Sequence, residues 1–164
     1  MKKLTSIILL CLSVAAILAG CANQQTAPSV AIANPWSTWN SIQEAEAAVG
    51  CSFGLPEVIA GSYNATEFRT MNNKLIEVVY SDGDFEVCVR KETGENQDVS
   101  GDYNQYETCS EENRSGAAIT TYFNSGNGAK KQLISHQGYS WSLVASNGYW
   151  GDSNEDFLQA IMET

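Results

Sequence analysis

The sequence predicts an α+β fold: a single twisted antiparallel β-sheet of five to seven strands, with an N-terminal and a C-terminal helix packed against it. Two segments near the ends of the predicted domain carry apolar residues at helical spacing, whereas the long stretch between them alternates apolar and polar residues. Turn signals such as Asp82-Gly83 and Asn147-Gly148 bound the alternating runs. Strands grouped between two helices favour α+β over the regular alternation of α/β folds.

Residues 1–20 are predicted to be a secretory signal. Lys2 and Lys3 precede an apolar run over residues 7–19, and Leu18-Ala19-Gly20-Cys21 has the form of a lipobox, the recognition element of bacterial lipoproteins. As a helix this run would reach only about 20 Å, short of a hydrocarbon core of about 30 Å. Leu18, Ala19 and Gly20 are therefore the predicted signal-peptidase recognition residues. Cys21 is the predicted lipidation site, and a thioether-linked diacylglycerol there would anchor the chain stably.

Residues 21–34 are predicted to be a lipidated flexible tether, and residues 35–164 a single domain. The segment 22–34 is small and polar with one proline, as linkers are. The first helix is predicted over residues 41–49, where Ser41 and Glu44 match a capping box and Gly50 supplies the C-terminal cap. Residues 51–55 then alternate, which indicates an extended segment.

The alternating stretch predicts up to seven strands and a final helix. The predicted strands are residues 63–71, 74–80, 85–90, 106–111, 117–123, 131–135 and 139–143. Segment 74–80 is apolar on both faces, which predicts a central position in the sheet. Residues 92–103 form the longest polar connection. The last helix begins at Ser153, which caps it with Asp156, and its apolar residues face one core.

Charge excludes one class of partner. The first 20 residues hold two of the nine basic side chains and none of the 19 acidic ones, so residues 21–164 have a formal charge of −12. A nucleic-acid partner is not expected, because no basic stripe faces phosphate. The charge is explained either by solubility at a surface, which we favour, or by binding of cations or basic partners.

Three cysteines need an explanation. Cys11 leaves with the signal and Cys21 takes the lipid, so Cys51, Cys88 and Cys109 remain. One disulfide between Cys88 and Cys109 is possible if their strands are neighbours, with Cys51 buried as a small hydrophobic residue. No Cys-x-x-Cys pair exists, which argues against a zinc ribbon or a thioredoxin-like site.

One acidic segment is a candidate calcium site. Asp98, Asp102, Asn104 and Glu107 offer hard oxygen ligands, and Gly101 permits a bend. Their order does not match the EF-hand spacing, so a solvated loop is the competing interpretation. No other metal site and no cofactor is predicted.

No catalytic residue is predicted, and the chain is not expected to be an enzyme. His136, the single histidine, lies beside the Gln137-Gly138 turn and is predicted to be exposed. No Gly-x-Ser-x-Gly nucleophile elbow is present. The tryptophans could line a saccharide or peptide groove, although core positions are the favoured interpretation. These residues are Trp36, Trp39, Trp141 and Trp150, of which Trp150 is the best candidate for exposure.

Several segments together resemble a family of small extracytoplasmic lipoprotein domains of unknown function from Gram-positive gut bacteria. The segments that carry the resemblance are residues 34–36, 44–50 with Pro56, 74–80, 82–84, 89–91, 98–104 and 138–142. They are turn and strand signatures rather than catalytic ones. The resemblance implies a location on the outer face of the cytoplasmic membrane and a fold, and it implies no activity.

The sequence thus predicts a membrane-tethered extracytoplasmic lipoprotein with a non-enzymatic binding or envelope-support role. Its partners would be the membrane, through the lipid on Cys21, and an unidentified protein or small ligand. Two alternatives remain open. One is a sensory or carrier domain that holds a small apolar ligand between sheet and helix. The other, less favoured, is a hydrolase of envelope polymers.

Overall fold

The structure is a computed structural model that describes residues 34–125, 129–145 and 153–164. Residues 35–164 form one compact unit. The predicted signal and lipobox, with Leu18, Ala19, Gly20 and Cys21, lie outside the described residues, as does Trp150.

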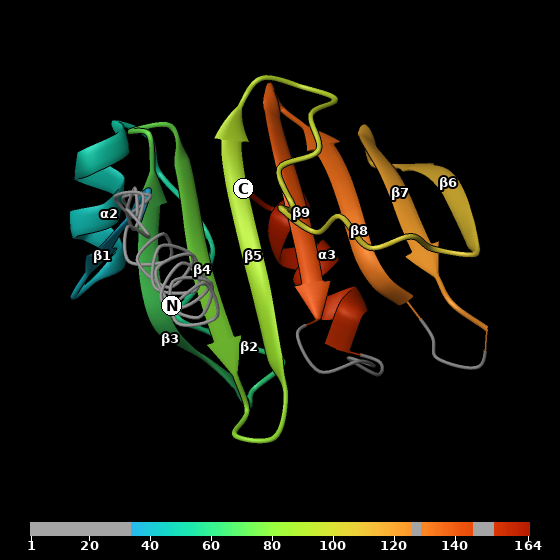
Figure 1. Cartoon of the computed structure of the whole chain (residues 1–164), viewed down its shortest axis with the longest axis horizontal. Coiled ribbons are helices and arrows are strands. Elements are labelled where there is room, and N and C mark those ends of the chain that lie inside the picture. The colour runs from blue at the N-terminus through green and yellow to red at the C-terminus, as the bar shows by residue number, and fades with distance from the viewer. Residues whose placement is uncertain (1–33, 126–128, 146–152) are drawn as a thin grey trace, which may run out of the picture. The chain divides into compact units, whose positions relative to one another are not determined.

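Nine strands form one sheet in the part of the chain that the structure describes, and every pair of neighbours is antiparallel. The order across the sheet is β1-β3-β4-β5-β9-β8-β7-β6, and β2 pairs with β3 beside this path (Figure 1). The strands are β1 (Trp36–Trp39), β2 (Val58–Ile59), β3 (Tyr63–Met71), β4 (Leu75–Ser81), β5 (Glu86–Thr93), β6 (Thr108–Arg114), β7 (Ala117–Phe123), β8 (Ala129–His136) and β9 (Tyr139–Ala145).

The prediction of five to seven strands is wrong, because the sequence pattern does not reveal β1 and β2. These strands have four and two residues. Alternation becomes recognisable only over about four to eight residues, so strands this short leave no pattern. The extended segment 51–55 forms no strand, and the chain pairs instead at Val58–Ile59. The predicted strand 106–111 begins two residues later, at Thr108.

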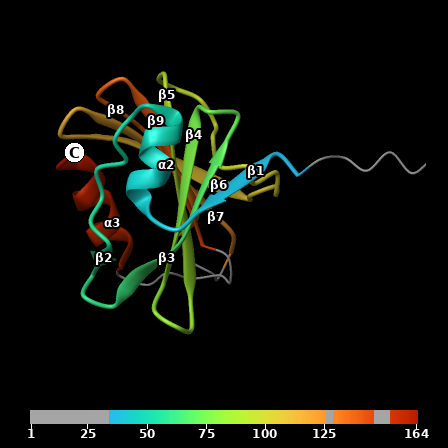
Figure 2. The same cartoon turned by 90° about the vertical axis from the view of Figure 1, so that its left-hand side faces the viewer.

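Two helices, α2 (Ile42–Val49) and α3 (Ser153–Met162), lie on the same side of the sheet (Figure 2). At the start of α2, Ser41 Oγ accepts a hydrogen bond from the backbone N–H of Glu44 at 3.3 Å. The Glu44 carboxylate accepts from the N–H of Asn40 rather than from that of Ser41. Gly50 ends the helix at φ 78°, a left-handed conformation that glycine adopts without strain.

Aromatic side chains fill the space between the sheet and the helices. Phe157 of α3 is fully buried, and its ring centroid lies 5.5 Å from that of Tyr63 and 5.4 Å from that of Tyr80. The rings of Phe53 and Trp141 also pack together, with their centroids 5.6 Å apart and their planes tilted by 53°. Aromatic pairs at these separations add to the stability that burial of their area provides. The space between the sheet and the helices is therefore filled by the protein's own side chains.

A lysine is buried in this core. Lys91 on β5 donates through Nζ to the carbonyl oxygens of Ser52 at 2.8 Å and Phe53 at 3.3 Å. The ammonium also lies over the rings of Tyr139 and Trp141, 4.1 Å and 4.5 Å from their centroids. Burial lowers the pKa of Lys91, because the interior disfavours the charged form. This contact fastens the strandless segment after α2 to the sheet.

The side of the sheet opposite the helices is called the open face here. A row of register-matched residues crosses it from β4 to β7, namely Glu77, Arg90, Ser142, Leu133 and Thr120. At one end of the sheet, β6 pairs only with β7, and six of its seven residues are exposed. The open face carries the charged and polar groups from which a site could be built.

Candidate functional site

The connection between β5 and β6, residues 94–107, crosses the open face and is called the strap. The two strands that it joins are separated in the sheet by β9, β8 and β7, so the strap has to pass these three strands. Figure 1 shows it passing in front of them. Near its start, the N–H of Gln97 donates to Ser140 Oγ at 2.9 Å and that of Asn96 to Ser135 Oγ at 3.3 Å. The sheet thus sets the path of the strap.

Arg90 joins the sheet to the middle of the strap. Its Nε–H donates to Glu77 Oε2 at 2.6 Å, and its Nη1 donates to the carbonyl oxygens of Val99 at 3.2 Å and Ser100 at 2.5 Å. Gly101 follows at φ +61°, where a Cβ would lie 2.1 Å from Arg90 Nη1. Both the backbone conformation and the close approach of the guanidinium require glycine there.

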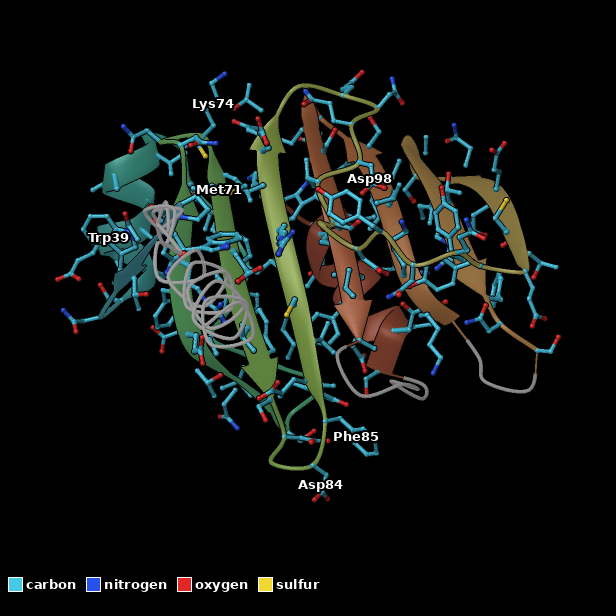
Figure 3. The ribbon with its side chains drawn as sticks, in the orientation of Figure 1. Trp39, Met71, Lys74, Asp84, Phe85 and Asp98 are labelled. Atoms are coloured by element: carbon cyan, nitrogen blue, oxygen red, sulfur yellow. The ribbon has the colours of Figure 1, made fainter. Side chains whose placement is uncertain are left out.

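Lys131 on β8 connects the sheet to the strap. Its side chain is only 6% exposed, and its Nζ lies 3.2 Å from Asp98 Oδ2 and 3.2 Å from the carbonyl oxygen of Asp102. The ammonium also lies over the rings of Tyr122 and Tyr106, at 4.6 Å and 5.5 Å. Figure 3 shows Asp98 on the strap, over the sheet. A buried ammonium needs such partners, because desolvation disfavours its charge.

The two aspartates of the strap have lowered pKa values. Partial burial by itself would raise the pKa of Asp98, but hydrogen bonds from Ser100 and Lys131 outweigh it. For Asp102 burial is outweighed in the same way, because its carboxylate accepts from the Tyr106 hydroxyl and from Asn104. Burial and then the Asp102 carboxylate raise the pKa of Tyr106 to about 12. These aspartates stabilise the strap above their unfolded pKa of about 4, and that stability is lost as pH falls through the lowered values.

A pocket of about 550 Å³ lies between the strap and the sheet. Its lining combines residues of the strap with residues of β5 and β9, and with Asn124 and Lys130 at the ends of β7 and β8. Small-molecule sites commonly have volumes of about 300–1,000 Å³. Most of the lining side chains are polar. The strap pocket is therefore the best candidate site that the described residues offer.

The structure does not gather the predicted calcium ligands. The Asp98 carboxylate accepts hydrogen bonds from Ser100 and Lys131, and the Asp102 carboxylate accepts them from Asn104 and Tyr106. Glu107 accepts from the N–H of Ser125 at 2.9 Å and from its hydroxyl. Within the described ranges, no group of three or more His, Cys, Asp or Glu side chains is placed to hold a metal ion. The prediction of a calcium site at Asp98, Asp102, Asn104 and Glu107 is not supported.

The predicted disulfide is wrong for a topological reason. Cys88 lies on β5 and Cys109 on β6, and three strands separate them in the sheet. At about 4.8 Å per strand their backbones are about 19 Å apart, whereas a disulfide needs Cα atoms within about 7 Å. Cys51, Cys88 and Cys109 are all free thiols.

Neither His136 nor any described tryptophan lines the strap pocket. His136 is 6% exposed rather than exposed as predicted, and neither ring nitrogen has a hydrogen-bond partner. Trp141 is a core residue, and Trp39 Nε1 donates to Thr70 Oγ1 at 3.0 Å. Trp36 packs against the Arg90 guanidinium at 5.1 Å. The described tryptophans do not line a saccharide or peptide groove, which is the less favoured interpretation of the sequence.

Sequence reasoning misses the two cations of the pocket, Arg90 and Lys130. The position of the Arg90 guanidinium depends on its contact with the Glu77 carboxylate, which is 13 residues away in the sequence and lies on the neighbouring strand. The position of Lys130 depends on an irregularity in the pairing of β7 with β8, which the amino-acid composition does not predict. The one usable signal is the adjacent pair Lys130-Lys131, which breaks the alternation of an otherwise half-buried strand.

Comparison with known protein families, curated proteins and solved structures finds no match. The resemblance drawn from the sequence therefore stays a prediction. No helix among the described residues combines the length and the apolar character that crossing a membrane requires.

We expect the three thiols to react at different rates with iodoacetamide. Burial, followed by the negative charge of Glu77, raises the pKa of Cys88 to about 11, and burial also raises the pKa of Cys51. A rise of about two units lowers the thiolate fraction about 100-fold. At pH 8, peptide mapping of the full chain should find Cys109 modified first. Rapid modification of Cys88, or a mass that rises by two daltons on reduction, would contradict the assignment.

Replacing Lys131 by methionine should loosen the strap. The variant keeps the shape of the side chain but removes its bonds to Asp98 and Asp102, and we expect a loss of about 1–2 kcal/mol in the free energy of unfolding. Hydrogen exchange of the amides of residues 98–106 should accelerate. Lys74→Met, at the exposed β3–β4 turn, is the control and should change neither quantity. Unchanged exchange in Lys131→Met would show that the lysine does not hold the strap.

Proposed function

We propose that this chain is an extracytoplasmic lipoprotein, anchored to a membrane through Cys21, that binds a small polar ligand in the strap pocket. The supporting observation is the pocket of about 550 Å³ with a mainly polar lining. Strap and sheet are fastened by Arg90, Lys131 and serine hydroxyls, so the lining groups are held before any ligand arrives. Such preorganisation reduces the entropy lost on binding.

The apolar-carrier alternative has less support. It needs space between the sheet and the helices, where Phe157, Phe53 and Trp141 pack against other rings. The hydrolase alternative also has less support, because His136 does not line the strap pocket and its ring nitrogens are unbonded. We therefore propose a binding protein rather than an enzyme.

The proposed anchor predicts that one cysteine substitution in the signal region has an effect and that a second has none. In a bacterium that processes lipoproteins, Cys21→Ala should abolish lipidation. The chain should then lack the mass of the lipid and should no longer require detergent for its release from the membrane. Cys11→Ala is the matched control, because a residue removed with the signal cannot alter the mature mass. A lipidated Cys21→Ala chain, or a mature mass changed by Cys11→Ala, would contradict the proposed anchor.

The proposed site predicts that filling the pocket prevents ligand binding. The full chain, purified in detergent and incubated with a small-molecule extract of bacterial envelopes, should show a ligand mass in native mass spectrometry. Val144→Trp places a bulky ring among the lining residues and should remove this mass. Val58→Trp, at an exposed position on β2, should retain it.

Circular dichroism should first show that Val144→Trp is folded. A wild-type chain that stays bare would contradict the proposed function. A ligand mass that survives in Val144→Trp would place the binding site elsewhere on the molecule.

A further inference from the structure

We propose that the strap pocket binds a hydroxylated organic carboxylate, such as a sugar acid, with the carboxylate held by Lys130. This inference rests on the proposed function, because it assigns a ligand class to the same pocket. Three features of the pocket carry it: the position of Lys130, the pairing of the other charges, and the amide side chains around them.

A β-bulge gives Lys130 its position. Tyr122 pairs with Lys131, but the next residue of β7, Phe123, pairs with Ala129, so Lys130 is the extra residue on β8. A bulge turns a side chain out of the regular alternation of its strand, and bulges often occur beside binding sites. Lys130 lines the strap pocket, and the following residue, Lys131, holds the strap.

The other charged groups at the pocket already have partners. Arg90 pairs with Glu77, and Lys131 pairs with Asp98. The Asp102 carboxylate accepts bonds from Tyr106 and Asn104. Lys130 forms no ion pair with any residue that the structure describes.

Lys130 thus has no counter-charge among the described residues, in a chain whose residues 21–164 carry 19 acidic and seven basic side chains. A ligand carboxylate would supply the missing charge through a charge-assisted hydrogen bond. Asp102 lines the same pocket and would repel a ligand that carries several negative charges.

Uncharged polar groups supply the second half of the recognition. Three residues with side-chain amides, Asn104, Gln105 and Asn124, line the pocket. Asn104 Nδ2 already donates to Asp102, and Asn124 Oδ1 accepts from the N–H of Glu107. An amide offers both donors and an acceptor, which matches the hydroxyl group, itself both donor and acceptor. Tyr103, between lining residues Asp102 and Asn104, is 95% exposed and offers a flat apolar face at this part of the strap.

Glucuronate and glucose test the inference, because they share their ring hydroxyls and differ in the carboxylate. The full chain, uniformly labelled with ¹⁵N and purified in detergent, would be titrated with each sugar and followed by amide chemical shifts. We expect glucuronate to shift the amides of Gly101, Asn104 and Asn124. Glucose should bind at least about 10-fold more weakly, since it lacks the charge-assisted bond.

Charge-neutralising variants locate the carboxylate. Lys130→Gln should weaken glucuronate binding by about 10-fold or more, whereas Lys130→Arg should largely retain it. Lys74→Gln removes the same charge from the exposed β3–β4 turn (Figure 3), which contributes no residue to the lining of the strap pocket, and should leave the affinity unchanged. This control separates a contact at Lys130 from a general effect of net charge.

The outcomes separate this inference from the proposed function. Equal affinity for glucose and glucuronate, or an unchanged affinity in Lys130→Gln, would overturn the carboxylate assignment. An absence of shifts at the pocket with both sugars would overturn the inference as well. In either case, an envelope ligand whose binding Val144→Trp abolishes would leave the proposed function standing. The inference and the proposed function would both be overturned only if, in addition, the wild-type chain bound no envelope ligand.

Discussion

The open face of this protein depends on the buried ion pair between Glu77 and Arg90. Both residues belong to the middle of the sheet, where β4 and β5 are neighbours, and Glu77 is only 2% exposed. A buried carboxylate is tolerable only when opposite charges and donors surround it, and Arg69 Nε also lies 3.3 Å from Glu77 Oε1. The planar guanidinium of Arg90 binds the carboxylate and two strap carbonyls at once. A lysine ammonium at this position would lack that fixed fork of donors.

The two faces of the sheet use the same device to hold a segment that has no regular structure. On the helix side, the Lys91 ammonium binds the carbonyl of Ser52 and lies over Tyr139. On the open face, the Lys131 ammonium binds the carbonyl of Asp102 and lies over Tyr122. In each case a strand supplies a cation, a neighbouring strand supplies an aromatic ring, and the loop supplies its backbone oxygen. Cation–π attraction is strongest when the cation is desolvated, as both lysines are.

Local pattern predicts the long elements of this fold and fails where the outcome depends on distant pairing. The strand 117–123 and the start of the final helix at Ser153 follow from residues within a few positions of each other, and the structure has both. The disulfide fails because β5 and β6 are consecutive in that part of the sequence, whereas three other strands lie between them in the sheet. The candidate site was predictable only as a polar connection. Its cations are placed by a cross-strand contact at Arg90 and by a bulge at Lys130, and neither has a local signature.

The edge strand β6 affects how readily copies of this protein associate with one another. An edge strand offers unpaired backbone groups to any other strand that meets it, and such contacts lead to aggregation. Tethering a domain to a membrane confines it to a plane and raises its effective concentration against its neighbours. The edge carries Glu111, Glu112 and Arg114, and Arg114 also pairs with Glu155 of α3. Two copies that approached edge to edge would bring like charges together, so on the proposed membrane anchor the acidic edge would keep neighbouring copies apart.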